Sequence, residues 1–201
     1  MRAVARQNIK VAYDPDTGFF GTDVKGSKYQ FTVSEYDRIL IVSRDGSFRI
    51  IGPEEKVLIP DRAIHAEVFD QENGAAFTVV YRDKDKIAWG KKIHIRAFIR
   101  DREYELIKDK RGRVDYLIPG DSADTIHVAF VPMKRQRTHS AEFDLSVIDF
   151  KGVSARGRRL APKPVSKVKR IRNDGDDGNI PEAKNEEPPK EADDQPLPFD
   201  E

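Results

Sequence analysis

The residues of this chain whose types and spacing suggest chemistry are lysines and arginines. Residues 151–172 contain nine Lys and Arg and no Asp or Glu. Gly152 and Gly157 interrupt this stretch, which we call the basic arm. Glycine lets a backbone approach a phosphate closely, and an arginine guanidinium can bind two phosphate oxygens at once. The basic arm therefore predicts a polyanionic partner.

Smaller basic groups, several of them beside a glycine, occur in the rest of the chain. They flank Gly26, follow the single tryptophan Trp89 and surround Gly112. If the folded units stack, such turns would line one edge and suit the regularly spaced phosphates of duplex DNA, with few groups arranged to read bases. The candidate DNA-binding residues are Lys25, Lys28, Lys91, Lys92, Arg96, Lys108, Lys110, Arg111, Arg113, Lys151, Arg156, Arg158, Arg159, Lys163, Lys167, Lys169 and Arg170.

No other pattern in the sequence predicts a catalytic or metal site. The four histidines are scattered, and no Gly-x-Ser-x-Gly or phosphate-loop motif is present. Asp14 and Asp16 resemble the start of a calcium loop, but the glycine and glutamate that should follow are missing, so turn formation around Pro15 explains them better. We predict no catalytic residue, no metal and no cofactor.

The net charge of +1 averages two regions of opposite sign. Residues 173–201 contain eleven Asp and Glu but two Lys, whereas residues 1–172 contain 34 basic and 24 acidic residues. The acidic segment is rich in Pro and Gly and has one aromatic residue, so we predict a disordered tail at 173–201. Tethered directly after the basic arm, this tail would compete with DNA at high effective concentration.

The composition also bears on the compartment. The chain has no cysteine, which excludes disulfides and thiolate metal sites and fits a reducing environment. No apolar run approaches the ~18 residues that a membrane span needs, and the N-terminal residues lack the apolar region of a secretory signal. These features predict a cytoplasmic protein with no membrane partner, and the DNA partner that the basic residues suggest would make it chromosome-associated.

Short apolar runs separated by turn residues predict an all-β fold. The Asp45-Gly46 pair between two apolar runs is a strong hairpin signal, because a type I′ turn needs positive φ. Comparable units recur loosely at the 40-residue spacing of propeller blades, which gives three to four blades. A crescent of blades and a β-sandwich both remain open. The predicted units are opening strands at 9–33 and hairpins at 39–51, 77–95, 104–118 and 126–150.

Two stretches of the chain resemble the C-terminal domain of bacterial type IIA topoisomerase A subunits, the family of DNA gyrase and topoisomerase IV. They are GFFGTDVKGSKYQFTVSEYDRILIVSRDGSFRII (18–51) and FDLSVIDFKGVSARGRRLAPKPVSKVKRI (143–171). The second is similar to the family's Lys-Gly-x-x-x-x-Gly repeat followed by a Lys-Pro-Val-like segment. The resemblance covers residues 9–172.

The resemblance implies a β-pinwheel, in which neighbouring propeller-like blades exchange strands. It implies a basic rim that binds and bends double-stranded DNA for a cleavage core, and a partner B subunit that is an ATPase. In some gyrases an acidic tail tunes DNA wrapping. The family's basic turn matches Lys151, Gly152, Arg156, Gly157, Arg158 and Arg159, and less closely Lys25, Gly26 and Lys28.

The departures from the family pattern shape the prediction. The gyrase box Gln-Arg-Arg-Gly-Gly-Lys-Gly is missing, which favours a topoisomerase IV-like role over gyrase-like wrapping. No tyrosine stands in the sequence context of the family's catalytic domain. We therefore expect this chain to be a part of a topoisomerase that does not cleave DNA by itself. We predict a DNA-binding domain at 1–172 and a tail at 173–201. The alternative is a β-rich protein-interaction module whose basic arm binds an acidic partner.

Overall fold

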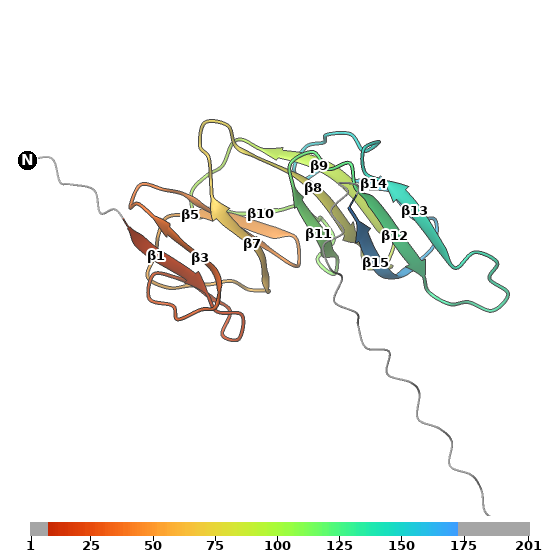
Figure 1. The fold of residues 1–201 in the computed structure, drawn as a ribbon, viewed down its shortest axis with the longest axis horizontal. Coiled ribbons are helices and arrows are strands. Elements are labelled where there is room, and N and C mark those ends of the chain that lie inside the picture. Colours follow the sequence, from red (N-terminus) through yellow and green to blue (C-terminus); the bar gives the residue numbers. More distant parts are fainter. Residues whose placement is uncertain (1–7, 173–201) are drawn as a thin grey trace, which may run out of the picture.

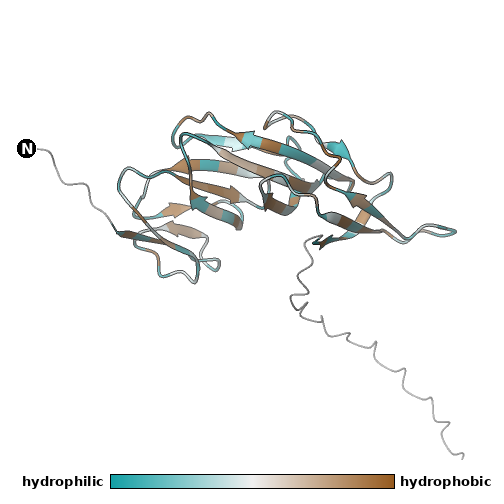
Figure 2. Cartoon of the chain, turned by 45° about the horizontal axis from the view of Figure 1, so that its top comes forward, coloured by the Kyte–Doolittle hydropathy of each residue, from teal (hydrophilic) through white to brown (hydrophobic). Residues whose placement is uncertain are grey.

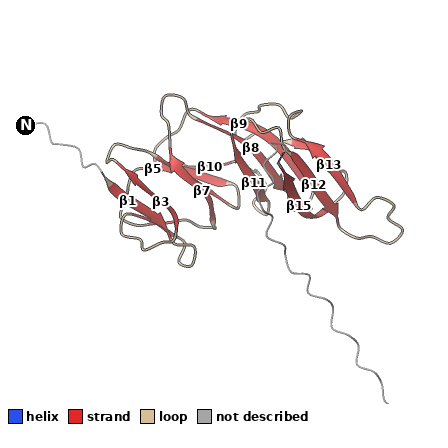
Figure 3. Cartoon of the chain, in the orientation of Figure 1, coloured by secondary structure: helices blue, strands red, loops and turns tan. Residues whose placement is uncertain are grey.

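The fold of this chain consists of strands, turns and loops. The computed structural model describes residues 8–172, so the tail predicted at 173–201 lies outside the described residues. Figure 3 shows strands and no helix in this part of the chain. The predicted all-β fold is therefore confirmed.

Within residues 8–172, fifteen strands form four small antiparallel sheets, which we call blades 1 to 4 in chain order. Blade 1 is ordered β3-β1-β2-β6, blade 2 β10-β5-β4-β7, blade 3 β11-β8-β9-β14 and blade 4 β13-β12-β15. The bounds are β1 Ile9–Tyr13, β2 Phe19–Gly21, β3 Lys28–Val33, β4 Ile39–Ser43, β5 Ser47–Ile51, β6 Val57–Leu58, β7 Ala63–Val68, β8 Ala75–Arg82, β9 Ala88–Ile95, β10 Glu103–Glu105, β11 Arg113–Pro119, β12 Thr125–Phe130, β13 Ser140–Asp144, β14 Arg158–Arg159 and β15 Val165–Ile171.

The blades share one topology. Each blade begins with a hairpin, which is β1-β2, β4-β5, β8-β9 or β12-β13. A later return strand then pairs with the first strand of the hairpin, and the four return strands are β3, β7, β11 and β15. Before returning, the chain of blades 2 to 4 gives a short exchanged strand, β6, β10 or β14, to the preceding blade. This exchange is the pinwheel feature that the resemblance implied.

Strand exchange corrects one predicted hairpin. The sequence around Gly112 predicts that residues 104–118 form a hairpin, but β10 pairs with β5 in blade 2 and β11 pairs with β8 in blade 3. The physical reason is Leu106, which is 1% exposed between these two blades and whose backbone N–H donates to Gly46 O at 2.7 Å. A local turn signal does not reveal which blade such an anchor enters.

The basic arm also proves to be part of the folded body. Residues 158–159 form β14 in blade 3, and residues 165–171 form β15 in blade 4. Leu160 and Val165 are buried between these strands, in the core that blades 3 and 4 share. Burying such aliphatic side chains contributes about 1.5–3 kcal/mol each, which fixes the arm against the preceding strands.

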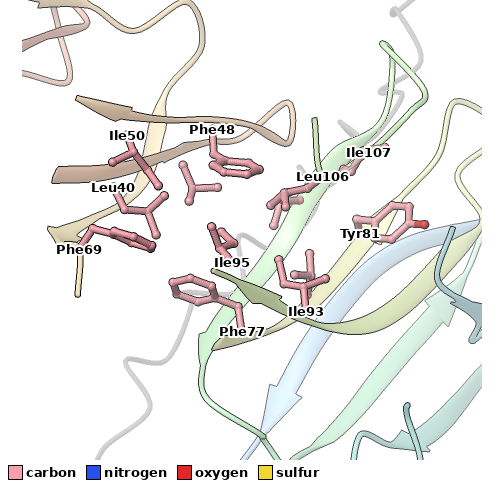
Figure 4. Close-up of a cluster of buried hydrophobic side chains, with 13 residues drawn as sticks. Leu40, Phe48, Ile50, Phe69, Phe77, Tyr81, Ile93, Ile95, Leu106 and Ile107 are labelled. Carbon is pink, nitrogen blue, oxygen red and sulfur yellow. The ribbon is translucent and has the colours of Figure 1, made fainter. Parts of the chain in front are cut away.

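Apolar cores join successive blades of the described chain. One lies between blades 1 and 2 and includes Tyr13, Phe20 and Ile39, and another lies between blades 3 and 4. The core between blades 2 and 3 is drawn in Figure 4, where Leu40 and Phe48 of blade 2 face Phe77 and Ile93 of blade 3. Each inner blade is thus apolar on both faces, which explains the unbroken apolar run of β4.

The blades stand in an open row. Blade 1, with β1 and β3, and blade 4, with β12 and β13, lie at opposite ends of the long axis in Figure 1. Among the described residues β13 has no exchanged strand on its outer edge, unlike β2, β5 and β9. In Figure 2 the apolar colour follows the strands, whereas the turns are mainly polar. The charged side chains of the turns are therefore available at the edges of the row.

Candidate nucleic-acid interface

Chain tracing places comparable segments of every blade at the same edge. The last residue of each first strand pairs with the first residue of the return strand, as in Tyr13 with Lys28 and Arg82 with Arg113. The hairpin turns, the starts of the return strands and the connections that lead to them therefore share one edge, which we call the turn edge. The opposite edge carries the links between blades at 34–38, 69–74 and 120–124, and we call it the linker edge.

The two edges differ in charge. The three links of the linker edge contain six acidic residues and one basic residue, Arg38. The turn edge is rich in basic side chains, nearly all of them exposed. They are Lys25, Lys28, Arg44, Arg62, Lys84, Lys86, Lys108, Lys110, Arg111, Arg113, Lys134, Arg135, Arg137, Lys163 and Lys167.

Hydrogen bonds between blades make the turn edge continuous. The Ala63 N–H donates to Tyr13 Oη at 3.1 Å, which ties blade 2 to blade 1. The Val114 N–H donates to Arg44 O, and the Val165 N–H donates to Lys86 O, both at 2.8 Å. These bonds tie blade 3 to blade 2 and blade 4 to blade 3 at equivalent places.

Two basic clefts open between the blades on this edge. A cleft of about 310 Å³ is lined by Lys28, Arg44 and Arg62 and reaches β11 of blade 3. A second cleft, of about 470 Å³, lies between blades 3 and 4 and is lined by basic residues of blade 3, with Val131 and Ser166 of blade 4. Its basic residues are Arg82, Lys84, Lys86, Arg111 and Arg113.

Several carboxylates of the turn edge accept hydrogen bonds from residues of the turns. Asp14 accepts from the Thr17 hydroxyl at 2.6 Å, and Asp45 accepts from the Ser47 N–H at 2.8 Å. Asp109 accepts from the Lys84 and Arg111 N–H groups, and these bonds hold its pKa below the ordinary value. These acids stabilise the turn backbone, and the lysines and arginines of the turn edge outnumber them.

The structure gathers many of the predicted residues and separates others. Arg156, Arg158 and Arg159 lie on or beside β14, next to the turn edge. Lys169 is exposed on the outer face of blade 4, whereas Arg96 and Lys151 lie away from the turn edge. Eight predicted residues lie on the turn edge itself: Lys25, Lys28, Lys108, Lys110, Arg111, Arg113, Lys163 and Lys167.

Two predicted DNA-binding residues are buried, and we remove them from the candidate surface. Lys91 is 0% exposed, and its ammonium group donates to Leu106 O at 2.7 Å, to Ala155 O at 2.9 Å and to Val153 O. Lys92 is 3% exposed and pairs with Asp121. The two strand faces of blade 3 both pack against neighbouring blades, so neither side chain reaches the surface.

The buried ammonium of Lys91 makes stability depend on pH. Burial, with smaller effects from Lys108 and Lys151, lowers its pKa from 10.5 to about 8. Above pH 8 the unfolded chain therefore binds this proton more strongly than the folded chain does, so stability rises with pH. Between pH 7 and 9 we expect the wild type to gain about 1.4 kcal/mol relative to Lys91→Met.

Urea unfolding of both proteins at pH 7 and pH 9 measures this gain. Lysines elsewhere titrate in both chains and cancel in the difference. A difference in stability that stays constant between the two pH values would contradict the burial of a charged Lys91.

Arg170 is also committed to the fold. Its guanidinium pairs with Asp124, which is buried, and its backbone N–H donates to Tyr116 Oη at 3.3 Å. The side chain lies on the inner side of blade 4, because Arg170 pairs with Ile126 in the sheet. Its neighbour Lys169 points to the outer face, as the alternation of a strand requires.

The candidate set from the sequence missed seven basic residues of the turn edge. These residues stand singly or in pairs beside acids, so a search for basic clusters passes over them. The signal that would identify them is their position, since each directly follows a first strand, precedes a return strand or lies in a hairpin turn. They are Arg44, Arg62, Lys84, Lys86, Lys134, Arg135 and Arg137.

Two glycines of the basic turns serve the packing of the backbone. A Cβ at Gly26 would lie 2.1 Å from Tyr13 O, and one at Gly157 would lie 2.6 Å from Gly90 O. Both distances are shorter than any real contact of a Cβ atom, so another residue would displace the neighbouring strand. These two glycines therefore allow close approach between strands, and close approach to phosphate stays a prediction.

The family assignment follows from residues 10–172, which match the family model described as topoisomerase C-terminal domain, Bacteroidota. The chain belongs to this family. The match spans all four blades of the topoisomerase C-terminal domain and ends at the last described residue. The resemblance noted in the sequence is thereby confirmed.

Known proteins similar to this topoisomerase C-terminal domain include the A subunit of DNA topoisomerase 4 from Borreliella burgdorferi. The two are 29% identical over 119 residues, which are 58% of this chain and 19% of the relative, so the match spans about a fifth of the relative's length. A crystal structure of the C-terminal domain of DNA topoisomerase IV matches with a TM-score of 0.46 and 10% identity, over 83% of this chain and 62% of that one.

The described residues contain no helix that could span a membrane. They also contain no group of three or more His, Asp or Glu side chains placed to hold a metal ion.

Proposed function

We propose that this topoisomerase C-terminal domain binds duplex DNA along its turn edge and bends it across successive blades. The observation that carries the proposal is the repetition of basic turns at the same end of all four blades, on an edge that hydrogen bonds make continuous. Lysines and arginines there would replace the counterions of the DNA phosphates. A duplex that follows this row of contacts from blade to blade can repay the cost of bending with the additional contacts that the bend permits.

The proposed binding has little dependence on sequence. Phosphate contacts position a protein on DNA, whereas recognition of bases requires an element that enters a groove. The described residues contain no helix, and the turns of this edge are short except for residues 131–139 between β12 and β13. We therefore assign the edge to holding and bending DNA of any sequence.

The proposed context is a larger topoisomerase assembly. The relative from Borreliella burgdorferi is by its name the A subunit of DNA topoisomerase 4, and this chain matches about a fifth of it. We propose that the domain presents bound DNA to a cleavage core and works with an ATPase B subunit, in a role closer to topoisomerase IV than to gyrase. Cleavage itself belongs to residues outside this chain.

The salt dependence of binding tests the proposal. Fluorescence anisotropy of a labelled random duplex, with the full chain as titrant, gives the affinity at several salt concentrations. We expect a log–log slope of about −5 or steeper, which corresponds to six or more phosphates, and energy transfer between the ends of a ~40-bp duplex that rises on binding. A slope near zero, or equal affinity for heparin and duplex, would instead favour a general module for acidic partners.

A further inference from the structure

We infer that the duplex is held most tightly at blade 3, where Arg156 stacked on Trp89 forms a fixed phosphate contact. The inference rests on the proposed function and assigns the strongest part of the same edge. Blade 3 gathers five exposed basic side chains that form no ion pair with any carboxylate of the described chain. They are Lys84, Lys86, Lys108, Lys110 and Arg111.

Two acids of blade 3, Asp83 and Asp115, have partners within the fold, whereas Asp85 is exposed between Lys84 and Lys86. Asp83 accepts from the Asp85 and Ile87 N–H groups and from the Trp89 indole N–H at 2.9 Å. Asp115 binds the guanidinium of Arg82, and both side chains are less than 10% exposed. Arg82 neutralises Asp115, and Arg156 lies beside Asp83, whereas Asp85 offsets part of the positive potential that blade 3 presents to solvent.

Arg156 differs from the other cations of the edge because an aromatic ring and a carboxylate hold its guanidinium group. Its Cζ lies 4.0 Å from the centroid of the Trp89 ring, and its Nη2 lies 3.7 Å from Asp83 Oδ2, yet its side chain is 69% exposed. The indole therefore holds one face of the guanidinium, while much of the group remains open to a ligand. A stacked guanidinium keeps its N–H fork in a plane that fits two phosphate oxygens.

The backbone on both sides of Arg156 is also fixed. The Gly157 N–H donates to Tyr81 Oη at 2.9 Å, and the buried Lys91 ammonium donates to Val153 O and Ala155 O. An exposed arginine normally loses side-chain freedom when it binds, and prior ordering reduces the entropy lost on binding. The buried Lys91 thus positions a phosphate contact that it does not itself make.

Within residues 8–172, no other arginine of the turn edge stacks on an aromatic ring. Two lysines lie near rings there: the Lys56 ammonium is 4.1 Å from the ring centroid of Phe19, and the Lys163 ammonium is 5.9 Å from that of Phe130, which is 6% exposed. The exposed cations of residues 131–139 lie in the long turn of blade 4 and stack on no ring of the described chain. Blade 3 therefore combines several exposed cations with an arginine that is held in place by a ring.

The single tryptophan makes the inference directly testable, because all indole fluorescence of the chain reports on blade 3. A random 20-bp duplex is titrated into the full chain while Trp89 emission and the anisotropy of labelled DNA are recorded in parallel. We expect both signals to change over the same DNA concentrations, and we expect quenching of Trp89 by acrylamide to fall at least twofold in the complex.

Arg156→Lys separates the stacked contact from charge alone. We expect a five- to tenfold loss of affinity, since lysine keeps the charge but loses the planar fork. The matched control is Arg102→Lys, because Arg102 also faces an aromatic ring, Tyr104 at 5.5 Å, but precedes β10 at the linker edge. This control should bind DNA like the wild type, and circular dichroism checks that both variants are folded.

The outcomes separate this inference from the proposed function. If anisotropy does not rise, DNA binding itself is contradicted. If anisotropy rises while Trp89 emission and quenching stay unchanged, the domain binds DNA elsewhere and only the assignment to blade 3 is wrong. If Arg156→Lys binds as tightly as the wild type, the stacked arginine is not a fixed contact.

Discussion

A chain in which Lys28, Lys110 and Lys134 are replaced by glutamine is expected to bind duplex DNA about 500-fold more weakly than the wild type at 0.1 M salt. The three residues are exposed on the turn edge of blades 1, 3 and 4, and the structure gives none of them an ion-pair partner in the described chain. Their removal should therefore leave the fold intact while reducing the number of phosphates that one molecule contacts.

The magnitude follows from counterion release. Each phosphate contact contributes about −0.9 to the log–log slope of affinity against salt, so three contacts contribute about −2.7. At 0.1 M salt this corresponds to a loss of about 10^2.7 in the binding constant, and the slope becomes shallower by the same 2.7. Anisotropy titrations at several salt concentrations measure both quantities for the same pair of proteins.

The matched control removes equal charge from elsewhere on the molecule. Arg96, Arg100 and Arg102 are exposed, and they lie at the linker edge, beside the ends of β9 and β5. Their replacement by glutamine should change affinity by less than about fivefold, because charges off the binding edge act only through a field that salt screens. Equal losses in the two triple variants would mean that net charge, and not a common edge, attracts DNA.

Sequence patterns determine the local parts of this fold well. Asp45-Gly46 identifies the β4-β5 hairpin, and the apolar runs identify β8, β9 and β12, because turn chemistry and side-chain alternation act over a few residues. Strand exchange is different. Ile59, Leu106 and Leu160 each anchor an exchanged strand in a neighbouring core, but the short apolar stretches in which they stand carry no signal of their destination.

For the candidate site, too, the sequence predicts what depends on composition but not what depends on packing. A polyanionic partner can be proposed from the sequence alone, because an excess of lysine and arginine over residues 1–172 does not depend on packing. The sequence does not predict which lysines face solvent. Lys91 and Lys92 stand beside each other like a surface pair, but β9 is packed on both faces, so adjacent side chains of opposite direction are both buried. The scattered cations of the turns become a surface only once four blades place them at one edge.

Replacing Arg82 with methionine is expected to lower the free energy of unfolding by about 3–5 kcal/mol, through the joint between blades 3 and 4. Arg82 is 6% exposed and donates from Nε to Asp115 Oδ2 at 2.7 Å and from Nη1 to Ser166 O at 3.0 Å. Without it the Asp115 carboxylate stays buried and keeps only Arg113, whose Nε is 3.7 Å away. An uncompensated buried charge has a cost of this size.

A double variant distinguishes the cost of the orphaned carboxylate from the value of the ion pair. Arg82→Met combined with Asp115→Leu removes both charges, so most of the lost stability should return, as it does when buried pairs are replaced by apolar groups. Urea unfolding of the wild type, both single variants and the double variant gives the coupling energy. Arg113→Gln, at the exposed partner, should cost less than about 1 kcal/mol. A single Arg82→Met variant as stable as the wild type would contradict this role of the ion pair. It would mean that the apolar core alone holds blade 4 against blade 3.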